Sequence, residues 1–263
     1  MSLRLEGVSY RYAGSAADVL SGIDLVVEPG EVVGLVGANE AGKTTVCLVA
    51  AGLAPATIGG RLEGTVRIDD LDTAAARPYE SAQHCGSLFQ NPATQLSGTA
   101  ATVWEEIAFG PRNLALPLAE VVVRVDEAVR LLAIADLVQR DPARLSGGQA
   151  QLVALAGVLA LRPAYLILDE PTSQLDPQGT RLVGDALGAL AAHAHAGVLI
   201  VEHKTDLLAG LASRVAVIEA GRLVTDGPAA TTLGDDRLPA WGVQPPSSVR
   251  LARSAAAAGV SLV

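Results

Sequence analysis

A glycine-rich segment of the chain has the residue types and the spacing that bind phosphate groups. It fits the pattern G-x-x-x-x-G-K-[ST] and consists of Gly37, Ala38, Asn39, Glu40, Ala41, Gly42, Lys43 and Thr44. An apolar run at 32–36 precedes it, and an expected helix at 42–51 follows it. Backbone N–H groups at such a helix start can surround a phosphate, and the helix dipole favours the negative charge. Lys43 would reach the β- and γ-phosphates of a nucleotide, Thr44 would place its hydroxyl on Mg²⁺, and Thr45 would contact a phosphate.

Two carboxylates follow an apolar segment further along the chain. The run at 166–168 leads directly into Asp169 and Glu170. Asp169 would support Mg²⁺, and Glu170 is placed to orient or activate an attacking water. The alternative, that both acids cap a helix beginning at Pro177, leaves the preceding apolar run unexplained.

A short segment one helix upstream of these acids could make further phosphate contacts. It consists of Leu145, Ser146, Gly147, Gly148 and Gln149. Ser146 is expected to cap a helix, and the two glycines let backbone N–H groups approach a phosphate closely. In isolation the segment could be an ordinary flexible turn, but its position upstream of the acidic strand argues against that interpretation.

The elements that must position these groups alternate between strands and helices. Short runs rich in Leu, Val, Ile or Tyr predict strands at 3–12, 23–27, 32–36, 64–68, 85–89, 164–169, 197–201 and 214–219. Helical spacing predominates from Thr99 to Ala160, and a further helix is expected at 177–193. This alternation predicts βαβ units and a parallel sheet. Residues 219–222 suggest a hairpin turn, and the alanine-rich end at 254–263 is expected to be loosely held.

Composition narrows the class of protein. The 263 residues are 50% hydrophobic and carry a net charge of −9, which argues against a nucleic-acid partner because phosphate binding favours a basic surface. Charge appears within the first six residues, which predicts no signal peptide, and no apolar run approaches the ~20 residues of a membrane helix. Any membrane role must therefore come through a partner. Cys47 and Cys85 lack metal or redox spacing and are expected to be reduced thiols of a cytosolic protein.

The order of the three segments resembles that of the ATP-binding cassette (ABC) ATPases. The resemblance covers residue 3 to about residue 227 and implies an α/β fold, the P-loop NTPase nucleotide-binding domain of ABC type. Such a domain has a parallel-sheet RecA-like core, an antiparallel β subdomain and an inserted α-helical subdomain, here at about 97–160. Residues 228–263 would form a small C-terminal extension and tail.

The resemblance also implies roles for individual residues. The segment Ser146–Gln149 would close over the γ-phosphate bound to a facing subunit, so that a head-to-tail dimer holds two ATP molecules. Gln90 would sense Mg²⁺ and the attacking water, and His203 would touch the γ-phosphate as the switch histidine. The D-loop, Ser173–Asp176, would communicate across the dimer and bring Asp176 toward the nucleotide.

The base of the nucleotide would lie against an aromatic side chain. Tyr12 is similar to the residue that stacks on adenine in this family. Tyr10 is the alternative, because in an alternating strand either tyrosine could instead be a core or a surface residue.

Two longer stretches resemble one branch of the family, the ATPases of energy-coupling factor (ECF) transporters, which include cobalt and nickel importers. They are Phe89–Leu96 and Thr102–Pro111, and Glu202-His203-Lys204 fits the same branch. The branch implies an ATPase pair at the cytoplasmic face of the cell membrane, a transmembrane scaffold protein and a small substrate-binding membrane protein. Hydrolysis would drive uptake of a vitamin or a transition-metal ion, and force would pass through a groove beside Gln90 that the expected helix at 102–110 lines.

Three other interpretations stay open at this point. The chain could serve a conventional importer that uses a separate binding protein, act as a soluble ABC protein of DNA repair or translation, or be a regulatory subunit without hydrolysis. Glu40 replaces a glycine that is usual in the phosphate loop, and Ala150 and Leu152 replace residues that are commonly basic. None of these departures removes a residue that performs the chemistry, so hydrolysis is still expected.

Overall fold

The structure is a computed structural model that describes residues 1–258. Its strands form a six-stranded sheet of order β10-β9-β3-β8-β7-β6 and a four-stranded sheet of order β2-β1-β4-β5. The strands are β1 Leu3–Arg11, β2 Leu20–Val27, β3 Val32–Val36, β4 Arg61–Ile68, β5 Leu71–Asp72, β6 Cys85–Leu88, β7 Tyr165–Asp169, β8 Gly197–Val201, β9 Arg214–Glu219 and β10 Arg222–Pro228. The α-helices are α1 Lys43–Ala50, α2 Pro78–His84, α3 Val103–Asn113, α4 Leu118–Leu131, α5 Gly147–Leu159, α6 Pro177–Ala194, α7 Thr205–Leu211, α8 Ala229–Leu233 and α9 Ser247–Ala257. Short 3₁₀ helices are η1 Pro92–Thr94, η2 Ala135–Leu137, η3 Pro142–Arg144 and η4 Leu238–Trp241.

The six-stranded sheet is parallel except for its edge strand β10, which runs antiparallel to β9. Every residue of β3, β7 and β8 is buried, as expected for strands that are covered on both faces. Alternate residues of β3 belong to two separate cores. Val33 and Leu35 pack with α1 and the four-stranded sheet, whereas Val32 and Val36 pack with the helices of the opposite face. The expected parallel α/β core is therefore confirmed.

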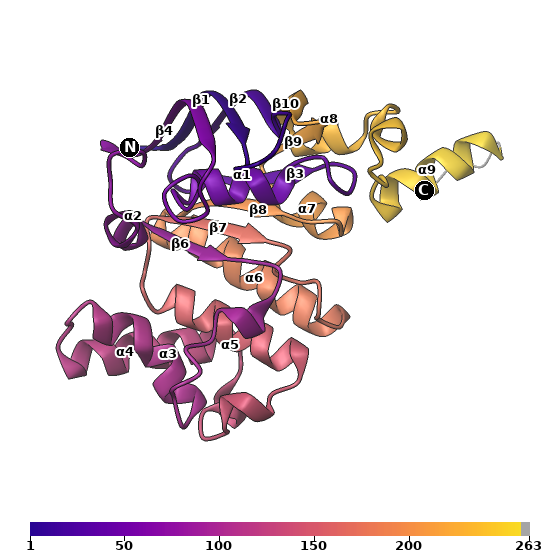
Figure 1. Cartoon of the computed structure of the whole chain (residues 1–263). Helices are drawn as coiled ribbons and strands as arrows, with labels where there is room; N and C mark the ends of the chain where they lie inside the picture. Colours follow the sequence, from indigo (N-terminus) through magenta and orange to yellow (C-terminus); the bar gives the residue numbers. More distant parts are fainter. Residues whose placement is uncertain (259–263) are drawn as a thin grey trace.

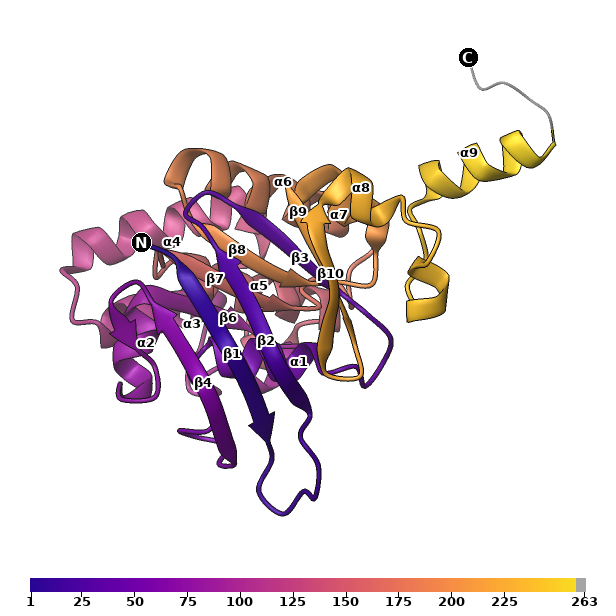
Figure 2. The same ribbon diagram turned by 90° about the horizontal axis from the view of Figure 1, so that it is seen from above.

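The four-stranded sheet covers α1 on the side away from the parallel sheet (Figures 1 and 2). In this sheet β1 pairs antiparallel with both β2 and β4. The register of β1 shifts between Leu5 and Val8, and Gly7 in the interruption has φ +57°. Because of this bulge, the buried residues are Leu3 and Leu5 before the interruption and Val8 and Tyr10 after it, so the alternation changes from odd to even positions.

Three helices, α3, α4 and α5, pack together next to the parallel sheet and follow β6 in the chain (Figure 1). The hydroxyl of Thr102 caps α3 by accepting the Glu105 N–H (3.2 Å), and the Glu105 carboxylate accepts the Thr102 N–H (3.2 Å). Ile107, Val125 and Leu155 are fully buried in the core that these helices share with the sheet. The capped start and the apolar face together stabilise α3, the first α-helix after Gln90.

The C-terminal part of the chain begins with the β9–β10 hairpin at the expected turn and continues through α8, η4 and α9. Helix α9 extends away from the body of the molecule and has no buried residue (Figure 2). Residues 254–257, expected to be loosely held, are helical, because alanine has the highest helix propensity. Residues 259–263 lie outside the described part of the chain. Within residues 1–258, no helix combines the length and the apolar character required to cross a bilayer.

Candidate functional site

The phosphate loop connects β3 to α1. Gly42 caps α1 with φ +108°, a backbone conformation that residues other than glycine rarely adopt. A Cβ atom at Gly37 would lie 2.2 Å from the carbonyl oxygen of Ile218, so the backbone can approach β9 only without a side chain. Lys43 Nζ donates hydrogen bonds to the carbonyl oxygens of Gly37 (2.9 Å) and Ala38 (2.7 Å). The lysine therefore spans the loop from the helix start to the strand end.

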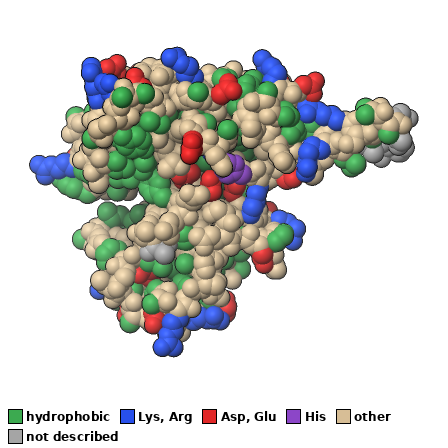
Figure 3. All heavy atoms as spheres, turned by 45° about the vertical axis from the view of Figure 1, so that its right-hand side comes forward, with side chains coloured by type: hydrophobic (Ala, Val, Ile, Leu, Met, Phe, Trp, Pro, Cys, Tyr) green, Lys and Arg blue, Asp and Glu red, His purple; other side chains and the backbone are tan. Residues whose placement is uncertain are grey.

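A cavity of about 400 Å³ opens beside this loop. It is lined by Val19, Asn39, Glu40, Gly42, Lys43, Thr44, Thr45, Gln90 and Glu170. Ala41 is buried and does not line the cavity. Burial lowers the pKa of Lys43, and the nearby carboxylates of Glu170 and Asp169 oppose the shift. Figure 3 shows acidic and histidine side chains gathered in the hollow between the upper and lower parts of the molecule.

The two candidate adenine-stacking tyrosines lie in different surroundings. Tyr10 is fully buried, and its hydroxyl donates to the carbonyl oxygen of Gly59. Tyr12 is half-buried, and its hydroxyl lies 3.1 Å from the Thr45 hydroxyl. Tyr10 is therefore a core residue, while Tyr12 lies beside the phosphate loop, from where its ring can contact a base. The role of Tyr12 stays a prediction.

The carboxyl ends of three adjacent parallel strands bring the expected catalytic residues together. Gln90 comes shortly after β6, Glu170 directly after β7, and His203 shortly after β8. Glu170 Oε2 accepts a hydrogen bond of 3.0 Å from Gln90 Nε2, and Glu170 Oε1 lies 3.1 Å from His203 Nε2. The Glu170 backbone, at φ +53°, donates its N–H to the carbonyl oxygen of Val201 (2.9 Å). A carboxylate held on both sides at the cavity can accept a proton from a water molecule.

Asp169, the last residue of β7, is a buried carboxylate next to Glu170. The residue is 1% exposed, and within residues 1–258 neither carboxylate oxygen makes a hydrogen bond of standard geometry, although the Thr44 side chain lies close enough to lower the pKa. Burial raises the pKa of Asp169, and the neighbouring Thr44 and Lys43 oppose the shift only in part. Buried carboxylates are normally paired or bound to a metal, and Mg²⁺ prefers oxygen ligands. Asp169, Thr44 and Gln90 therefore fit a divalent cation next to the phosphates.

The segment Ser146–Gln149 lies at the start of α5, and none of its residues lines the cavity beside the phosphate loop. The Ser146 hydroxyl accepts the Gln149 backbone N–H (3.3 Å), and the side-chain Oε1 of Gln149 accepts the Ser146 N–H (3.0 Å). The D-loop packs closely here, since a Cβ atom at Gly148 would lie 3.0 Å from the backbone carbonyl oxygen of Gln174. The structure therefore does not bring this segment to the phosphate loop of the same chain.

Three further positions singled out in the sequence have packing or capping contacts. Asp176 caps α6 by accepting the Gly179 N–H (2.7 Å), and it does not line the cavity. Ala150 is buried, and Leu152 packs against the core around α3 and α5. Ala150 and Leu152 therefore contribute to the packing of α5.

Glu202 and Lys204 are neighbours of the site whose contacts the sequence did not reveal. Glu202 is 3% exposed and accepts hydrogen bonds from the Thr172 hydroxyl and from the N–H of His203 (2.8 Å). The sequence signal that could have identified them is a pair of charges that flanks a histidine directly after the apolar run at 197–201.

Glu40 departs from the usual phosphate loop in two physical respects. Its backbone has φ +63°, a left-handed conformation that favours glycine. Its side chain is exposed and lines the cavity, which places a carboxylate near the phosphates of a bound nucleotide. The carboxylate therefore opposes tight nucleotide binding.

Replacing Glu40 with Gly should tighten ATP binding about three- to tenfold, because it removes a negative charge that faces phosphates across a solvated gap. Calorimetric titration with ATP measures the change. The control is Glu40→Gln, which removes the charge and keeps a Cβ atom in the left-handed conformation, and it should give most of the gain. Weaker or unchanged binding by both variants would contradict the electrostatic explanation.

Comparison with known proteins agrees with this geometry. Residues 20–173 match the protein family described as ABC transporter. A putative ABC transporter ATP-binding protein from Methanosarcina mazei is 37% identical over 253 residues, which are 95% of this chain, and the match spans 42% of that relative's length. The energy-coupling factor transporter ATP-binding protein EcfA from Methanosarcina acetivorans is 36% identical over 99% of this chain and 92% of its own.

A solved structure of an ABC transporter subunit has a similar fold. The structure of cbiO1 from Clostridium perfringens, part of the ABC transporter complex cbiONQ, is similar with a TM-score of 0.78 and 28% identity. The similarity covers 95% of this chain and 98% of cbiO1. The expected P-loop NTPase fold and the resemblance to ABC ATPases are thereby confirmed. The family match, the relatives and the site geometry together show that this chain belongs to the ABC transporter family, as one of its ATPase domains.

Proposed function

We propose that this chain binds ATP with Mg²⁺ and hydrolyses it as one half of an ATPase pair that powers a membrane importer. The observation that carries the proposal is the Glu170 carboxylate, held between Gln90 and His203 at the cavity beside the phosphate loop. This arrangement places a proton acceptor, an amide and an imidazole around the position where the terminal phosphate of ATP would lie.

The side chains around the cavity have different roles in hydrolysis. Lys43 and the N–H groups of the loop bind the β- and γ-phosphates, and Tyr12 contacts the adenine. Asp169 and Thr44, with Gln90, would hold Mg²⁺, which would supply positive charge to offset that of the phosphates. Glu170 orients the attacking water in line with the bond to be broken and accepts its proton.

The position of Ser146 supports an active dimer. Ser146 and Gly148 lie outside the cavity of their own chain, and Ser146 is exposed at the start of α5. An exposed helix start with free N–H groups is suited to bind an anion. In a head-to-tail pair, each chain presents this helix start to the γ-phosphate bound by its partner, so two ATP molecules lie in the interface. Asp176 then acts near this interface as part of the D-loop.

A small cavity of about 150 Å³, between α3, α5 and the residues that follow η1, is the docking position for a membrane protein. Gln95, which lines it, donates to the carbonyl oxygen of Ser87 (3.0 Å) and accepts the Phe89 N–H (2.7 Å). Phe109, 45% exposed, lines the same cavity. A partner segment seated there would contact Gln95, whose hydrogen bonds to Ser87 and Phe89 connect it to the strand end just before Gln90. Motion could pass by this route between membrane and site.

The names of EcfA and cbiO1 support an ECF-type importer. In this assembly the chain lies at the cytoplasmic face of the membrane, with a transmembrane scaffold and a small substrate-binding membrane protein. The transported substrate would be a vitamin or a transition-metal ion. Residues 1–227 would form the ATPase domain, with the helical subdomain at about 97–160, and residues 228–263 the extension.

Two measurements test the proposal. The purified protein should release phosphate from ATP in the presence of Mg²⁺, and removal of Mg²⁺ with EDTA should abolish the release. Co-expression with membrane proteins that are encoded by neighbouring genes should yield a complex that contains a scaffold and a small substrate-specific subunit. A protein that binds ATP without turnover would contradict the catalytic part, and a complex with a conventional permease pair would contradict the ECF assignment.

A further inference from the structure

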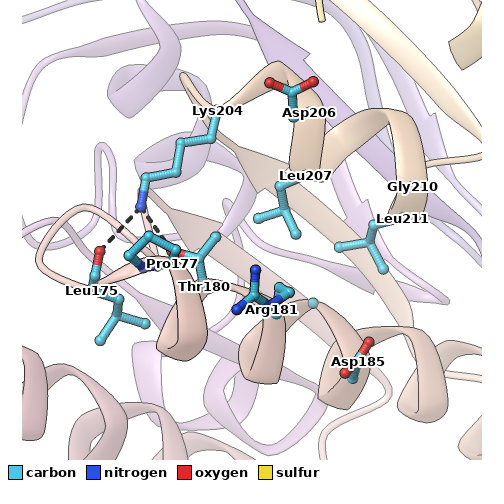
Figure 4. A pocket seen from close by; sticks show the side chains of 11 residues that line it. Leu175, Pro177, Thr180, Arg181, Asp185, Lys204, Asp206, Leu207, Gly210 and Leu211 are labelled. Carbon is cyan, nitrogen blue, oxygen red and sulfur yellow. Dashed lines mark hydrogen bonds between the residues drawn. The ribbon is translucent and has the colours of Figure 1, made fainter. Parts of the chain in front are cut away.

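Lys204 connects the loop of the switch histidine to residues 172–180, a segment that contains the D-loop and the first turn of α6. Its Nζ atom donates to the carbonyl oxygens of Thr172 (2.8 Å) and Leu175 (3.4 Å) and to the Thr180 hydroxyl (2.9 Å). Figure 4 shows the side chain crossing from the start of α7 to Leu175 and Thr180 at one end of a cavity of about 600 Å³. All three donors of the ammonium are thus directed at one short segment of the chain.

A second contact joins the same two segments from the buried side. The Glu202 carboxylate accepts the Thr172 hydroxyl through Oε1 and the N–H groups of His203 (2.8 Å) and Lys204 (3.2 Å) through Oε2. Glu202 is 3% exposed, so water does not compete for these bonds. His203 therefore lies between two residues that are both fixed to the segment after β7.

Helix stability does not explain the position of Lys204. Thr180 lies in the first turn of α6, where the helix dipole disfavours a positive charge. Within residues 1–258 the Lys204 ammonium makes no ion pair with a carboxylate that would offset this cost. The arrangement instead links two loops that both adjoin Glu170, since the Ser173 N–H donates to the Glu170 carbonyl oxygen (3.1 Å).

We propose that Lys204 is a positioning residue for hydrolysis, which holds the His203 loop in register with the D-loop. A displacement of the D-loop then moves the Lys204 side chain and, through the adjacent backbone, the His203 imidazole relative to Glu170. The inference rests on the proposed ATPase function. It adds a specific route by which the D-loop, at the expected dimer interface, controls the geometry of the catalytic residues.

The test is the steady-state ATPase activity of the Lys204→Met variant. Because Lys204 does not line the nucleotide cavity, KM for ATP should stay within about threefold of wild type. The kcat should fall about 10- to 100-fold, as expected when a catalytic group is displaced by around an ångström. Lys204→Arg, which retains the charge and the N–H donors, should recover kcat to within about fivefold of wild type.

Arg181 provides a matched control in the same cavity. It is an exposed cation on α6 (Figure 4), and within the described residues it makes no hydrogen bond or ion pair. Arg181→Met should leave kcat within about twofold of wild type, since surface charges act weakly through solvent. Thermal unfolding of each variant checks that the chain remains folded.

Thr180→Val tests the same contact without removing the lysine. It should lower kcat about two- to fivefold, and the double variant Thr180→Val/Lys204→Met should be no slower than Lys204→Met alone, because both changes break one contact. If the Lys204→Met chain does not fold, Thr180→Val serves as the test. A lower kcat at unchanged KM then supports the inference, and a normal kcat overturns it.

The inference is overturned by a normal kcat in Lys204→Met, by an equal loss in Arg181→Met, or by a rise in KM at constant kcat. Those results leave the proposed function intact, provided that the wild-type chain hydrolyses ATP. Absence of hydrolysis by the wild-type protein overturns both.

Discussion

Replacing Glu170 with Gln should lower kcat for ATP hydrolysis about 100- to 10,000-fold, the range expected for loss of a general base. Gln has nearly the same shape, so its amide can still lie between Gln90 and His203. It cannot accept the proton of the attacking water. ATP binding should persist, since Lys43 and the loop N–H groups are unchanged, and the ATP-bound pair should accumulate because turnover no longer separates it.

The measurements are phosphate release and size-exclusion chromatography with Mg²⁺ and ATP. The variant should elute as a dimer with ATP and as a monomer without nucleotide. Glu105→Gln is a suitable control, because Glu105 caps α3 and does not line the nucleotide cavity. Near-normal turnover in Glu170→Gln would exclude Glu170 as the base.

Two inactive variants should restore activity when they are mixed. Lys43→Ala removes the ammonium that binds the phosphates, and Ser146→Arg places a long cation at the exposed start of α5. Each change alone should reduce ATPase activity at least about 100-fold, since each removes contacts with the transferred phosphoryl group. In a head-to-tail pair of one Lys43→Ala chain and one Ser146→Arg chain, one of the two sites has an intact loop and an intact helix start.

The mixture should therefore regain up to about a quarter of wild-type activity, because half of the randomly formed pairs carry one intact site of two. As the control, the double variant Lys43→Ala/Ser146→Arg is mixed with Lys43→Ala, so that no pair contains an intact loop. This mixture should stay inactive. Failure of the two single variants to complement each other would mean that the helix start does not act on the partner's nucleotide.

Some parts of this molecule could be predicted from the sequence because their patterns are local. The strands at 32–36 and 197–201 have the expected bounds, since a strand buried on both faces is an apolar run whatever its neighbours are. Helix starts are also local, as Thr102 and Ser146 show through their reciprocal capping bonds. Strand β4 begins at Arg61, earlier than expected, because its polar residues are held by pairing with β1.

The contacts among the catalytic residues depend on the order of strands in the sheet. Gln90 and Glu170 are 80 residues apart, and Glu170 and His203 are 33 apart. No local pattern places them together. They meet because β6, β7 and β8 are neighbours and their carboxyl ends lie at one edge of the sheet. The sequence indicated these residues through family resemblance, whereas the tertiary structure supplies the hydrogen bonds that give each a role.

The sequence by itself determined the phosphate loop, the acidic strand end and the class of protein, because each is encoded within a few adjacent residues. Only the tertiary structure placed Tyr10 in the core and Tyr12 beside the phosphate loop, and only it revealed the contacts of Lys204. Strict alternation from Leu3 would point Tyr10 away from the core, but the bulge at Gly7 reverses the alternation and buries it. The physical reason is that a side chain's surroundings depend on register and on strand neighbours, which are set by contacts between distant segments.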